Sequence, residues 1–237
     1  MTNHSQRKWT AIDRFIGDTL ALSDSALDAA LKASATAALP EIQVTACQGK
    51  LLQLLALLQG ARKILEIGTL GGYSTIWLAR ALPPGGRLIT LELDPHHAEV
   101  ARSNLARAGL SKLVELLVGP ALETLPTLAA QAPFDLIFID ADKSSTPEYF
   151  SWAMKFSRRG SLIIVDNVIR KGALLDKTAD PAVRGMRRFI KRLAAQKGIS
   201  STVVQTVGSK GYDGFAVALV TGGTRPTPQR VAGCGSG

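Results

Sequence analysis

Hydrophobic residues recur at helical spacing through the first 60 residues of the chain. One series comprises Ile12, Phe15, Ile16 and Leu20, and a later one comprises Ile42, Val44, Leu51, Leu52, Leu55 and Leu58. The later series leads to Gly60, and glycine is a residue type that commonly ends a helix. The pattern predicts that residues 1–60 are helical and extend the domain that follows them.

From residue 63 onward, short apolar runs alternate with amphipathic segments. Runs rich in Ile, Leu and Val are typical of parallel strands that are buried on both faces. They cover residues 64–67, 88–91, 113–118, 136–139 and 162–165. Asp94 and Thr146 each precede a proline, which is typical of the N-cap and first turn of a helix. Five strand–helix units in succession predict a doubly wound α/β fold with a mostly parallel sheet.

Residues 202–207 and 215–220 are also strand-like, but only the seven residues 208–214 separate them. A parallel crossover needs a dozen or more residues, so these strands should be antiparallel neighbours. The sheet is then predicted to have seven strands and an antiparallel last strand, unlike a plain dinucleotide-binding sheet. We take residues 61–221 as the core of the domain. Residues 222–237 are rich in Gly, Pro, Thr and Arg and are predicted to be a disordered tail.

Composition places the chain among single-domain globular proteins. About 46% of its 237 residues are hydrophobic, which is enough for a substantial core. The longest apolar run, residues 51–58, is interrupted by Gln53 and is far shorter than the roughly 20 residues of a membrane span. The start of the chain lacks the apolar segment of a secretory signal. Two cysteines, Cys47 and Cys234, are too few for a disulfide framework. We therefore expect a cytoplasmic setting without membrane contact.

The chain has a net charge of +9, and its basic residues are densest between residues 184 and 197. Apolar residues recur there at helical spacing, so the basic residues form the outer side of an amphipathic helix. Such a pattern is more often a solvated helix face than a nucleic-acid surface, and no aromatic-rich RNA-binding motif accompanies it. We expect no nucleic-acid partner, and an enzyme that acts on RNA is kept as an alternative.

A glycine-rich turn follows the first predicted strand. Gly68, Gly71 and Gly72 let the backbone approach a ligand closely and expose free N–H groups at the start of the next helix. An anionic or nucleotide-like group suits this position, although the spacing differs from the dinucleotide fingerprint G-x-G-x-x-G. A tight strand-to-helix connection without a ligand is the simpler alternative.

Two acidic residues near this turn favour a ligand with adenosine at one end and a charged amino acid at the other. Glu92 ends the second predicted strand twenty residues after Gly72, where a carboxylate can accept hydrogen bonds from both ribose hydroxyls. Glu66 lies inside the apolar first strand and needs a partner such as an ammonium or a backbone N–H group.

With these features the chain resembles the class I S-adenosylmethionine-dependent methyltransferases. It is similar specifically to the metal-dependent small-molecule O-methyltransferases that include the catechol and caffeoyl-CoA enzymes. The resemblance covers about residues 40–220. It is carried by residues 66–74, 91–94, 119–121, 138–143, 166–167 and 210–215.

The resemblance implies a role for particular residues in binding the cofactor. Glu92 would hold the ribose, and Ala121 would border the adenine. Ser74 and the backbone near Val44 would meet the methionine carboxylate, and Glu66 would lie at the amino-acid end. The cofactor-binding residues implied in this way are Val44, Glu66, Gly68, Thr69, Ser74, Glu92, Ala121 and Asp140. The resemblance also implies a homodimer.

Oxygen donors follow two neighbouring strands of the predicted sheet. Asp140 ends the fourth strand, and Asp166 and Asn167 follow the fifth, so the three can converge at the carboxyl edge of the sheet. Two carboxylates and an amide suit Mg²⁺, or alternatively Mn²⁺ or Ca²⁺, and do not suit zinc or copper. Capping of the following segments is the simpler explanation of the aspartates. Lys143, three residues after Asp140, can reach a bound hydroxyl and act as general base.

Our leading interpretation is an S-adenosylmethionine-dependent O-methyltransferase whose substrate is a phenolic small molecule. An ionised hydroxyl of a catechol-like aromatic, or of another aromatic with vicinal hydroxyls, attacks the sulfonium methyl, and Lys143 and Asp140 are the catalytic residues. The runner-up, an NAD-dependent short-chain dehydrogenase, would need Tyr-x-x-x-Lys, but Ala153 stands four residues after Tyr149. A nucleotide-binding protein without catalysis is a third alternative.

Two departures from the family pattern leave the preferred acceptor open. Many relatives have Asn after Arg-x-Phe on the helix past the fifth strand, where this chain has Ile190. Asn-Tyr is frequent after the lysine of the fourth motif, where residues 144–146 are Ser-Ser-Thr.

Overall fold

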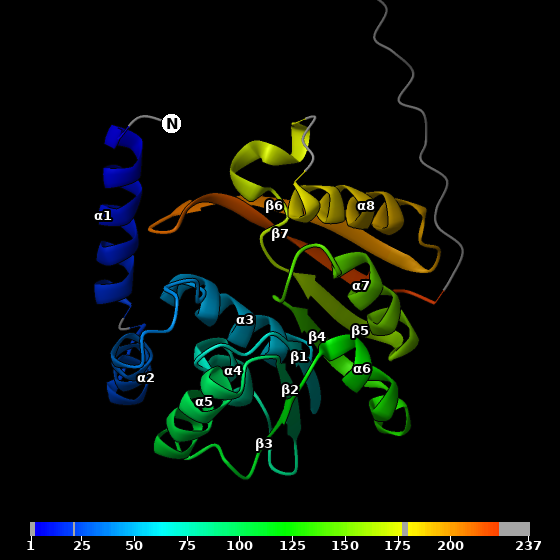
Figure 1. The fold of residues 1–237 in the computed structure, drawn as a ribbon, viewed down its shortest axis with the longest axis horizontal. Coiled ribbons are helices and arrows are strands. Elements are labelled where there is room, and N and C mark those ends of the chain that lie inside the picture. Colours follow the sequence, from blue (N-terminus) through cyan, green and yellow to red (C-terminus); the bar gives the residue numbers. More distant parts are fainter. Residues whose placement is uncertain (1–2, 21, 177–179, 223–237) are drawn as a thin grey trace, which may run out of the picture.

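The computed structural model of the chain describes residues 3–20, 22–176 and 180–222. Within them a seven-stranded sheet has the order β3-β2-β1-β4-β5-β7-β6 (Figure 1). Strands β1 to β5 are parallel, and β7 is antiparallel to both β5 and β6. The strands are β1 Lys63–Ile67, β2 Arg87–Glu92, β3 Val114–Val118, β4 Phe134–Ile139, β5 Ser157–Val165, β6 Ile199–Gly208 and β7 Gly211–Val220. The predicted fold class is confirmed, including the antiparallel last strand.

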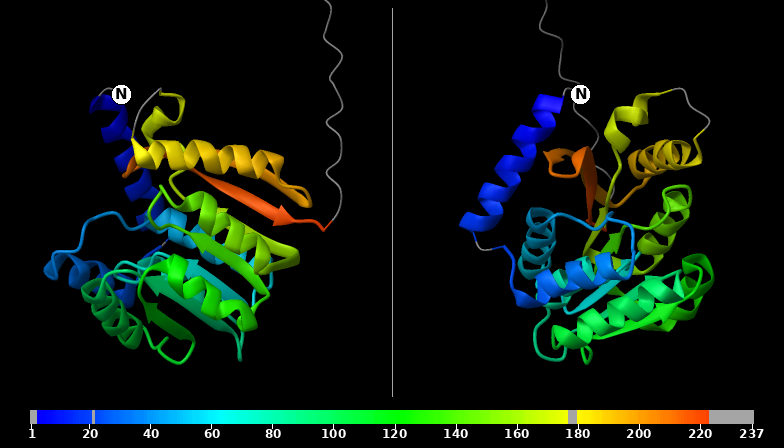
Figure 2. Two further views of the ribbon diagram at one scale, coloured as in Figure 1. Left: turned by 45° about the vertical axis from the view of Figure 1, so that its right-hand side comes forward. Right: turned by 60° about the vertical axis from the view of Figure 1, so that its left-hand side comes forward.

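Helices cover both faces of this sheet (Figure 2). The helices are α1 Asn3–Thr19, α2 Ser25–Thr36, α3 Ala46–Leu58, α4 Tyr73–Ala79, α5 Pro95–Arg107, α6 Ala121–Thr124, α7 Thr146–Lys155 and α8 Pro181–Ala195, with 3-10 turns η1 Leu125–Gln131 and η2 Arg170–Leu175. Buried side chains of α2 to α5 pack against one face of the sheet. Those of η1, α7 and α8 pack against the other face, so the molecule has three layers and two cores.

Several local predictions need correction. The helix expected from Ile42 begins only at Ala46, because Thr45 caps it by accepting a hydrogen bond from the Gln48 N–H. Asp94 caps α5 as predicted, whereas the N-cap of α7 is Ser145, and Thr146 is the first helical residue.

The last two strands extend beyond their apolar runs into polar sequence. The ladder between β6 and β7 continues to the pair Gly208 and Gly211, so only two residues form the turn instead of the seven expected. Residues 113–118 were predicted to form a strand buried on both faces. Strand β3 instead lies at the edge of the sheet, and its side chains are half-buried or exposed.

Helix α1 lies beside the tip of the β6–β7 hairpin (Figure 1). The Gln6 side-chain amide donates to the carbonyls of Gly208 and Ser209, at 3.0 and 3.1 Å. The Asp13 carboxylate accepts from the Ser209 N–H at 2.7 Å. These contacts attach α1 to the turn between β6 and β7.

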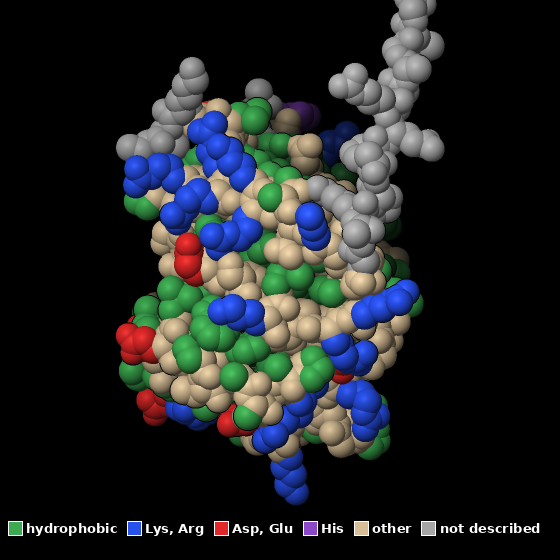
Figure 3. Space-filling model, turned by 90° about the vertical axis from the view of Figure 1, so that its right-hand side faces the viewer, with side chains coloured by type: hydrophobic (Ala, Val, Ile, Leu, Met, Phe, Trp, Pro, Cys, Tyr) green, Lys and Arg blue, Asp and Glu red, His purple; other side chains and the backbone are tan. Residues whose placement is uncertain are grey.

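Helix α8 carries the basic cluster as the sequence predicts, with its apolar side buried. Some of its basic side chains form hydrogen bonds within the protein. Arg188 donates to the Ser144 carbonyl and Arg192 to the Pro147 carbonyl. Lys and Arg side chains are scattered between apolar ones over the face shown in Figure 3. None of the described helices has the length and apolar character needed to cross a membrane. The predicted disordered tail lies, except for Gly222, outside the described residues, as does Cys234.

Candidate active site

A cavity of about 780 Å³ opens at the carboxyl ends of the parallel strands. Its walls come from the loops that follow β1, β2, β3, β4 and β5, and from the segment that precedes α3. Of the residues predicted for the site, those that line it are Val44, Gly68, Thr69, Ser74, Glu92, Ala121, Asp140, Lys143 and Asn167. Glu66 and Asp166 are predicted site residues that do not line it; Asp166 lines a second cavity together with Gln48 and Asn167.

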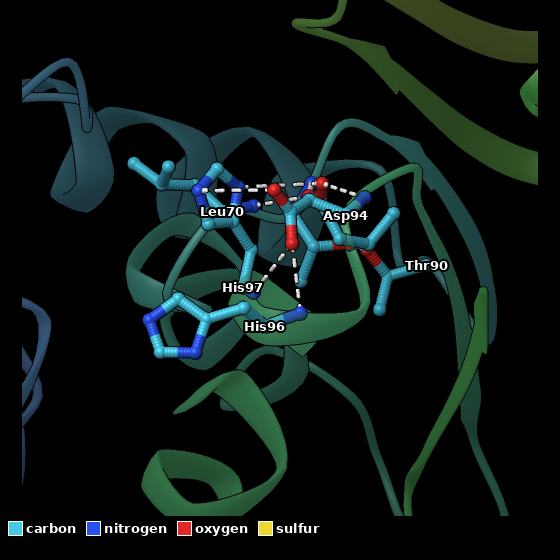
Figure 4. A network of polar contacts seen from close by, with 7 residues as sticks. Leu70, Thr90, Asp94, His96 and His97 are labelled. Carbon is cyan, nitrogen blue, oxygen red and sulfur yellow. Dashed lines mark hydrogen bonds and ion pairs between the residues drawn. The ribbon is translucent and has the colours of Figure 1, made fainter. Parts of the chain in front are cut away.

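The glycine turn is held by the carboxylate of Glu92. Its Oε2 accepts hydrogen bonds from the N–H groups of Thr69 and Leu70, at 3.1 and 2.7 Å (Figure 4). Its Oε1 accepts from the Asp94 N–H at 3.0 Å and lies 3.5 Å from His97 Nδ1. The sequence predicted a ligand contact for Glu92. The hydrogen bonds by which Glu92 holds the loop were not predicted.

Gly68 allows the end of β1 to lie directly against the end of β4. Its φ of +99° is in the region that favours glycine, and a Cβ added there would lie 2.4 Å from the Asp140 carbonyl oxygen. Glycine at this position is therefore required by the backbone of the site, independently of any ligand.

Glu66 is fully buried and has hydroxyl partners where the sequence predicted an ammonium or a backbone N–H group. Ser74 Oγ, Thr75 Oγ1 and Thr90 Oγ1 donate to it at 2.7, 2.5 and 2.7 Å. Burial raises the pKa of Glu66 to about 7, although these hydroxyls oppose the shift. Because Ser74 lines the cavity, Glu66 acts on the site by orienting the Ser74 hydroxyl.

The predicted oxygen donors lie together beside the cavity. Asp166 is only 4% exposed, and burial together with the nearby negative charge of Asp140 raises the pKa of Asp166 to about 7. The Lys143 ammonium lies 2.6 Å from Asp140 Oδ1. Within the described ranges, no cluster of three or more His, Cys, Asp or Glu side chains is placed to hold a metal ion. The predicted set differs from such a cluster because its third donor is the Asn167 amide.

Two residues of the site were missed by the sequence analysis. Gln48, in the first turn of α3, donates from Nε2 to Asp166 Oδ2 at 2.7 Å. Arg170, at the start of η2, lines the cavity. For Gln48 the sequence offers no signal, because the contact joins residues 118 positions apart. Arg170 could have been noticed as the third residue after Asn167.

Further polar residues lie on the loops and helix starts around the cavity. Asp142 supports the loop before α7, accepting hydrogen bonds from the Tyr149 hydroxyl and the Ser145 N–H. His96 and His97 point apart at the start of α5 (Figure 4), with ring centroids 6.4 Å apart.

Comparison with known proteins identifies the family. Residues 19–216 match the family model described as O-methyltransferase. The chain belongs to the O-methyltransferase family. The predicted family and enzyme class are thereby confirmed, and the dehydrogenase alternative is set aside.

Curated relatives of this O-methyltransferase include two proteins named catechol O-methyltransferase. The one from Mycobacterium tuberculosis is 56% identical over 209 residues, covering 88% of this chain and 94% of the relative. The one from Niastella koreensis is 53% identical over 213 residues, covering 89% and 96%.

Solved structures similar to this O-methyltransferase confirm its fold. The O-methyltransferase from Bacillus cereus in complex with SAH has a TM-score of 0.89 and 53% identity, covering 91% of this chain and 100% of that one. TomG from Streptomyces achromogenes, described as involved in tomaymycin synthesis and in complex with SAM, has a TM-score of 0.89 and 52% identity, covering 94% and 100%.

Proposed function

We propose that this enzyme transfers a methyl group from S-adenosylmethionine to a hydroxyl of a small catechol-like aromatic, assisted by a divalent cation and by Lys143. The observation that carries the proposal is the half-buried Asp140 near the buried Asp166, with Asn167 and Lys143, beside a cavity that also contains the glycine turn. The names of the two catechol O-methyltransferase relatives support this acceptor class.

The cofactor fits the part of the cavity nearest the glycine turn. Ser74, Val44 and Ala121 line the cavity, and in this proposal the first two meet the methionine carboxylate and Ala121 borders the adenine. The carboxylate of Glu92, already fixed by two backbone N–H groups, accepts from the ribose hydroxyls. Bound SAH or SAM in the two solved relatives supports this assignment.

A divalent cation fits the donors Asp140, Asp166 and Asn167. The chemistry of the set is hard and oxygen-only, which favours Mg²⁺, with Mn²⁺ or Ca²⁺ as alternatives. Burial, together with the nearby negative charge of Asp140, raises the pKa of Asp166, and added positive charge would favour the ionised form of both carboxylates. When bound, the cation would orient vicinal hydroxyls and lower the pKa of the acceptor hydroxyl.

Lys143 is the base. Its side chain is only 10% exposed and its Nζ is held at Asp140, on the cavity wall where an acceptor hydroxyl is expected. To act as base, the Lys143 ammonium first releases a proton to solvent, and Nζ then takes the proton of the acceptor hydroxyl. The phenolate oxygen then forms a bond to the methyl carbon as the carbon–sulfur bond breaks, and the electron pair stays on sulfur. Opposite charges disappear in this step, so a cavity that excludes water and aligns the reactants favours it.

The protein is a homodimer in this proposal. Helix α3 exposes leucines at a spacing of three and four residues, namely Leu51, Leu54 and Leu58, with exposed fractions of 36, 47 and 84%. A row of exposed leucines on one helix side is typical of an interface.

Methyl transfer to catechol, measured as product formation with S-adenosylmethionine, tests the proposal. We expect EDTA to abolish turnover and added Mg²⁺ to restore it. Asp166→Ala should lower kcat/KM by about 100-fold or more, since loss of a buried ligand removes several kcal/mol. Glu99→Ala, which removes an exposed carboxylate of α5, is the matched control and should be unaffected. Turnover that survives EDTA or Asp166→Ala would refute the role of the cation.

A further inference from the structure

Arg170 is a cation of the cavity wall that the proposed chemistry does not use. It lies three residues after Asn167, and Lys143 and Arg170 are the Lys and Arg residues that line the cavity. The two differ in their partners, because Lys143 is paired with Asp140. Arg170 makes no ion pair with any described residue. Its Nε is buried and lacks a hydrogen-bond acceptor within the part of the chain that the structure describes.

The acidic side chains around Arg170 have other hydrogen-bond partners, including Asp213, which accepts from the Arg170 backbone N–H and forms no ion pair with the guanidinium. The residues outside the described ranges are 1–2, 21, 177–179 and 223–237, and none of them is Asp or Glu. The acidic residues of the cavity are already engaged. Glu92 holds the glycine turn, Asp140 holds Lys143, and Asp142 accepts from the loop before α7. Among the described residues, the Arg170 guanidinium is therefore a cation of the cavity wall without an ion-pair partner.

The backbone at Arg170 is held in a strained conformation. Arg170 and Lys171 have φ values of +55° and +57°, which are unfavourable for residues with a Cβ. The Asp213 carboxylate of β7 holds this turn by accepting from the N–H groups of Ile169 and Arg170, at 3.0 and 2.9 Å. Strained conformations that the fold maintains are concentrated at binding and catalytic sites.

We propose that Arg170 is a specificity-determining residue that binds a carboxylate substituent on the aromatic acceptor. The inference rests on the proposed function and narrows its acceptor class to aromatic vicinal diols that carry a carboxylate. The planar guanidinium donates two parallel hydrogen bonds to a carboxylate, a fit that a lysine ammonium does not reproduce. A neutral catechol leaves this charge unpaired, and a catechol with an ammonium substituent is repelled by it.

The test compares three acceptors of similar size in the full-length enzyme: 3,4-dihydroxybenzoate, catechol and 3,4-dihydroxybenzylamine. In the wild type, kcat/KM should fall in that order. Arg170→Gln should lower kcat/KM for the benzoate by about 10- to 100-fold, as expected for a charged hydrogen bond, and mainly through KM. For catechol it should change kcat/KM by less than about threefold. Arg170→Lys should lie between the wild type and Arg170→Gln on the benzoate. Lys171→Gln, at the exposed neighbouring residue, removes the same charge and should leave all three values unchanged.

Binding measurements separate this inference from the proposed reaction. Calorimetric titration of benzoate and catechol into the wild type and Arg170→Gln reports the contact even if no acceptor is turned over. Equal losses on both acceptors would mean that Arg170 only supports the fold, and an unchanged benzoate affinity would mean that it makes no such contact. A weakened Kd for S-adenosylmethionine with unchanged acceptor affinity would instead assign Arg170 to the cofactor carboxylate. Each of these three results overturns the proposal.

Discussion

The buried carboxyl group of Glu66 makes the stability of this enzyme depend on pH. Burial raises the pKa of Glu66 from an ordinary 4.5 to about 7, so the folded state binds a proton that the unfolded state releases in this interval. By linkage, stability is highest below pH 4.5 as far as this group is concerned, and it falls as the pH rises toward 7. The difference between the two pKa values corresponds to about 3 kcal/mol of unfolding free energy.

Glu66→Gln isolates this contribution, because the amide has nearly the same shape and does not titrate. The hydroxyls of Ser74, Thr75 and Thr90, which donate to the carboxylate, can rotate to accept from the new amide N–H groups. We expect the variant to match the wild type within about 1–2 kcal/mol at pH 5. The quantity to follow is the unfolding free energy of the variant minus that of the wild type. This difference should be about 3 kcal/mol larger at pH 8 than at pH 5.

Urea unfolding followed by circular dichroism at intervals from pH 5 to pH 8 measures this difference. Asp166 also has a raised pKa, but it is present in both proteins and therefore cancels in the comparison. Glu99→Gln on the exposed side of α5 is the control, and its difference from the wild type should be independent of pH. Parallel stability profiles for the wild type and Glu66→Gln would show that the three hydroxyls keep Glu66 ionised throughout, contrary to our reasoning.

Three further predictions concern the backbone, the acid pair and the assembly. Gly68→Ala should lower the unfolding free energy by about 2 kcal/mol or more in thermal unfolding, because its Cβ would clash with the Asp140 carbonyl. Gly109→Ala, with positive φ but open space, should cost about 1 kcal/mol; equal losses would argue against the clash. Gln48→Leu, which leaves Asp166 Oδ2 without its donor, should raise the Mg²⁺ concentration for half-maximal activity about 10-fold, and an unchanged value would contradict this role. Leu54→Glu should convert the dimer to a monomer in size-exclusion chromatography with light scattering; a monomeric wild type at micromolar concentration would disprove the dimer.

The fold could be predicted from the sequence because its signals are local. Continuous apolar runs reveal strands buried on both faces, and the short connection before β7 allows only an antiparallel pairing. Prediction failed where tertiary contacts override local pattern. Thr45 ends the loop before α3 although Ile42 and Val44 fit the helical spacing, and β6 and β7 extend through polar residues because each supplies the backbone partners of the other.

The candidate site likewise contains some residues that could be predicted from the sequence and some that could not. Glu92, Asp140 and Asn167 could be placed from sequence because strand ends converge at one edge of a parallel sheet. Gln48 could not, since its contact with Asp166 depends on how α3 packs. The next residue, Gly49, allows close contact with Trp77, whose ring atom Cδ1 would be 2.3 Å from an added Cβ. No periodic pattern records such a contact.

The attachment of α1 to the β6–β7 turn makes that turn tolerant of variation. Gln6 and Asp13 bind main-chain carbonyl and N–H groups there, which every amino acid other than proline provides. The side chain at 209 can therefore vary while α1 stays attached, whereas the Lys210 side chain donates to the Glu41 carbonyl. Gly208 is the exception, since a Cβ there would lie 2.5 Å from Asp13 Oδ2.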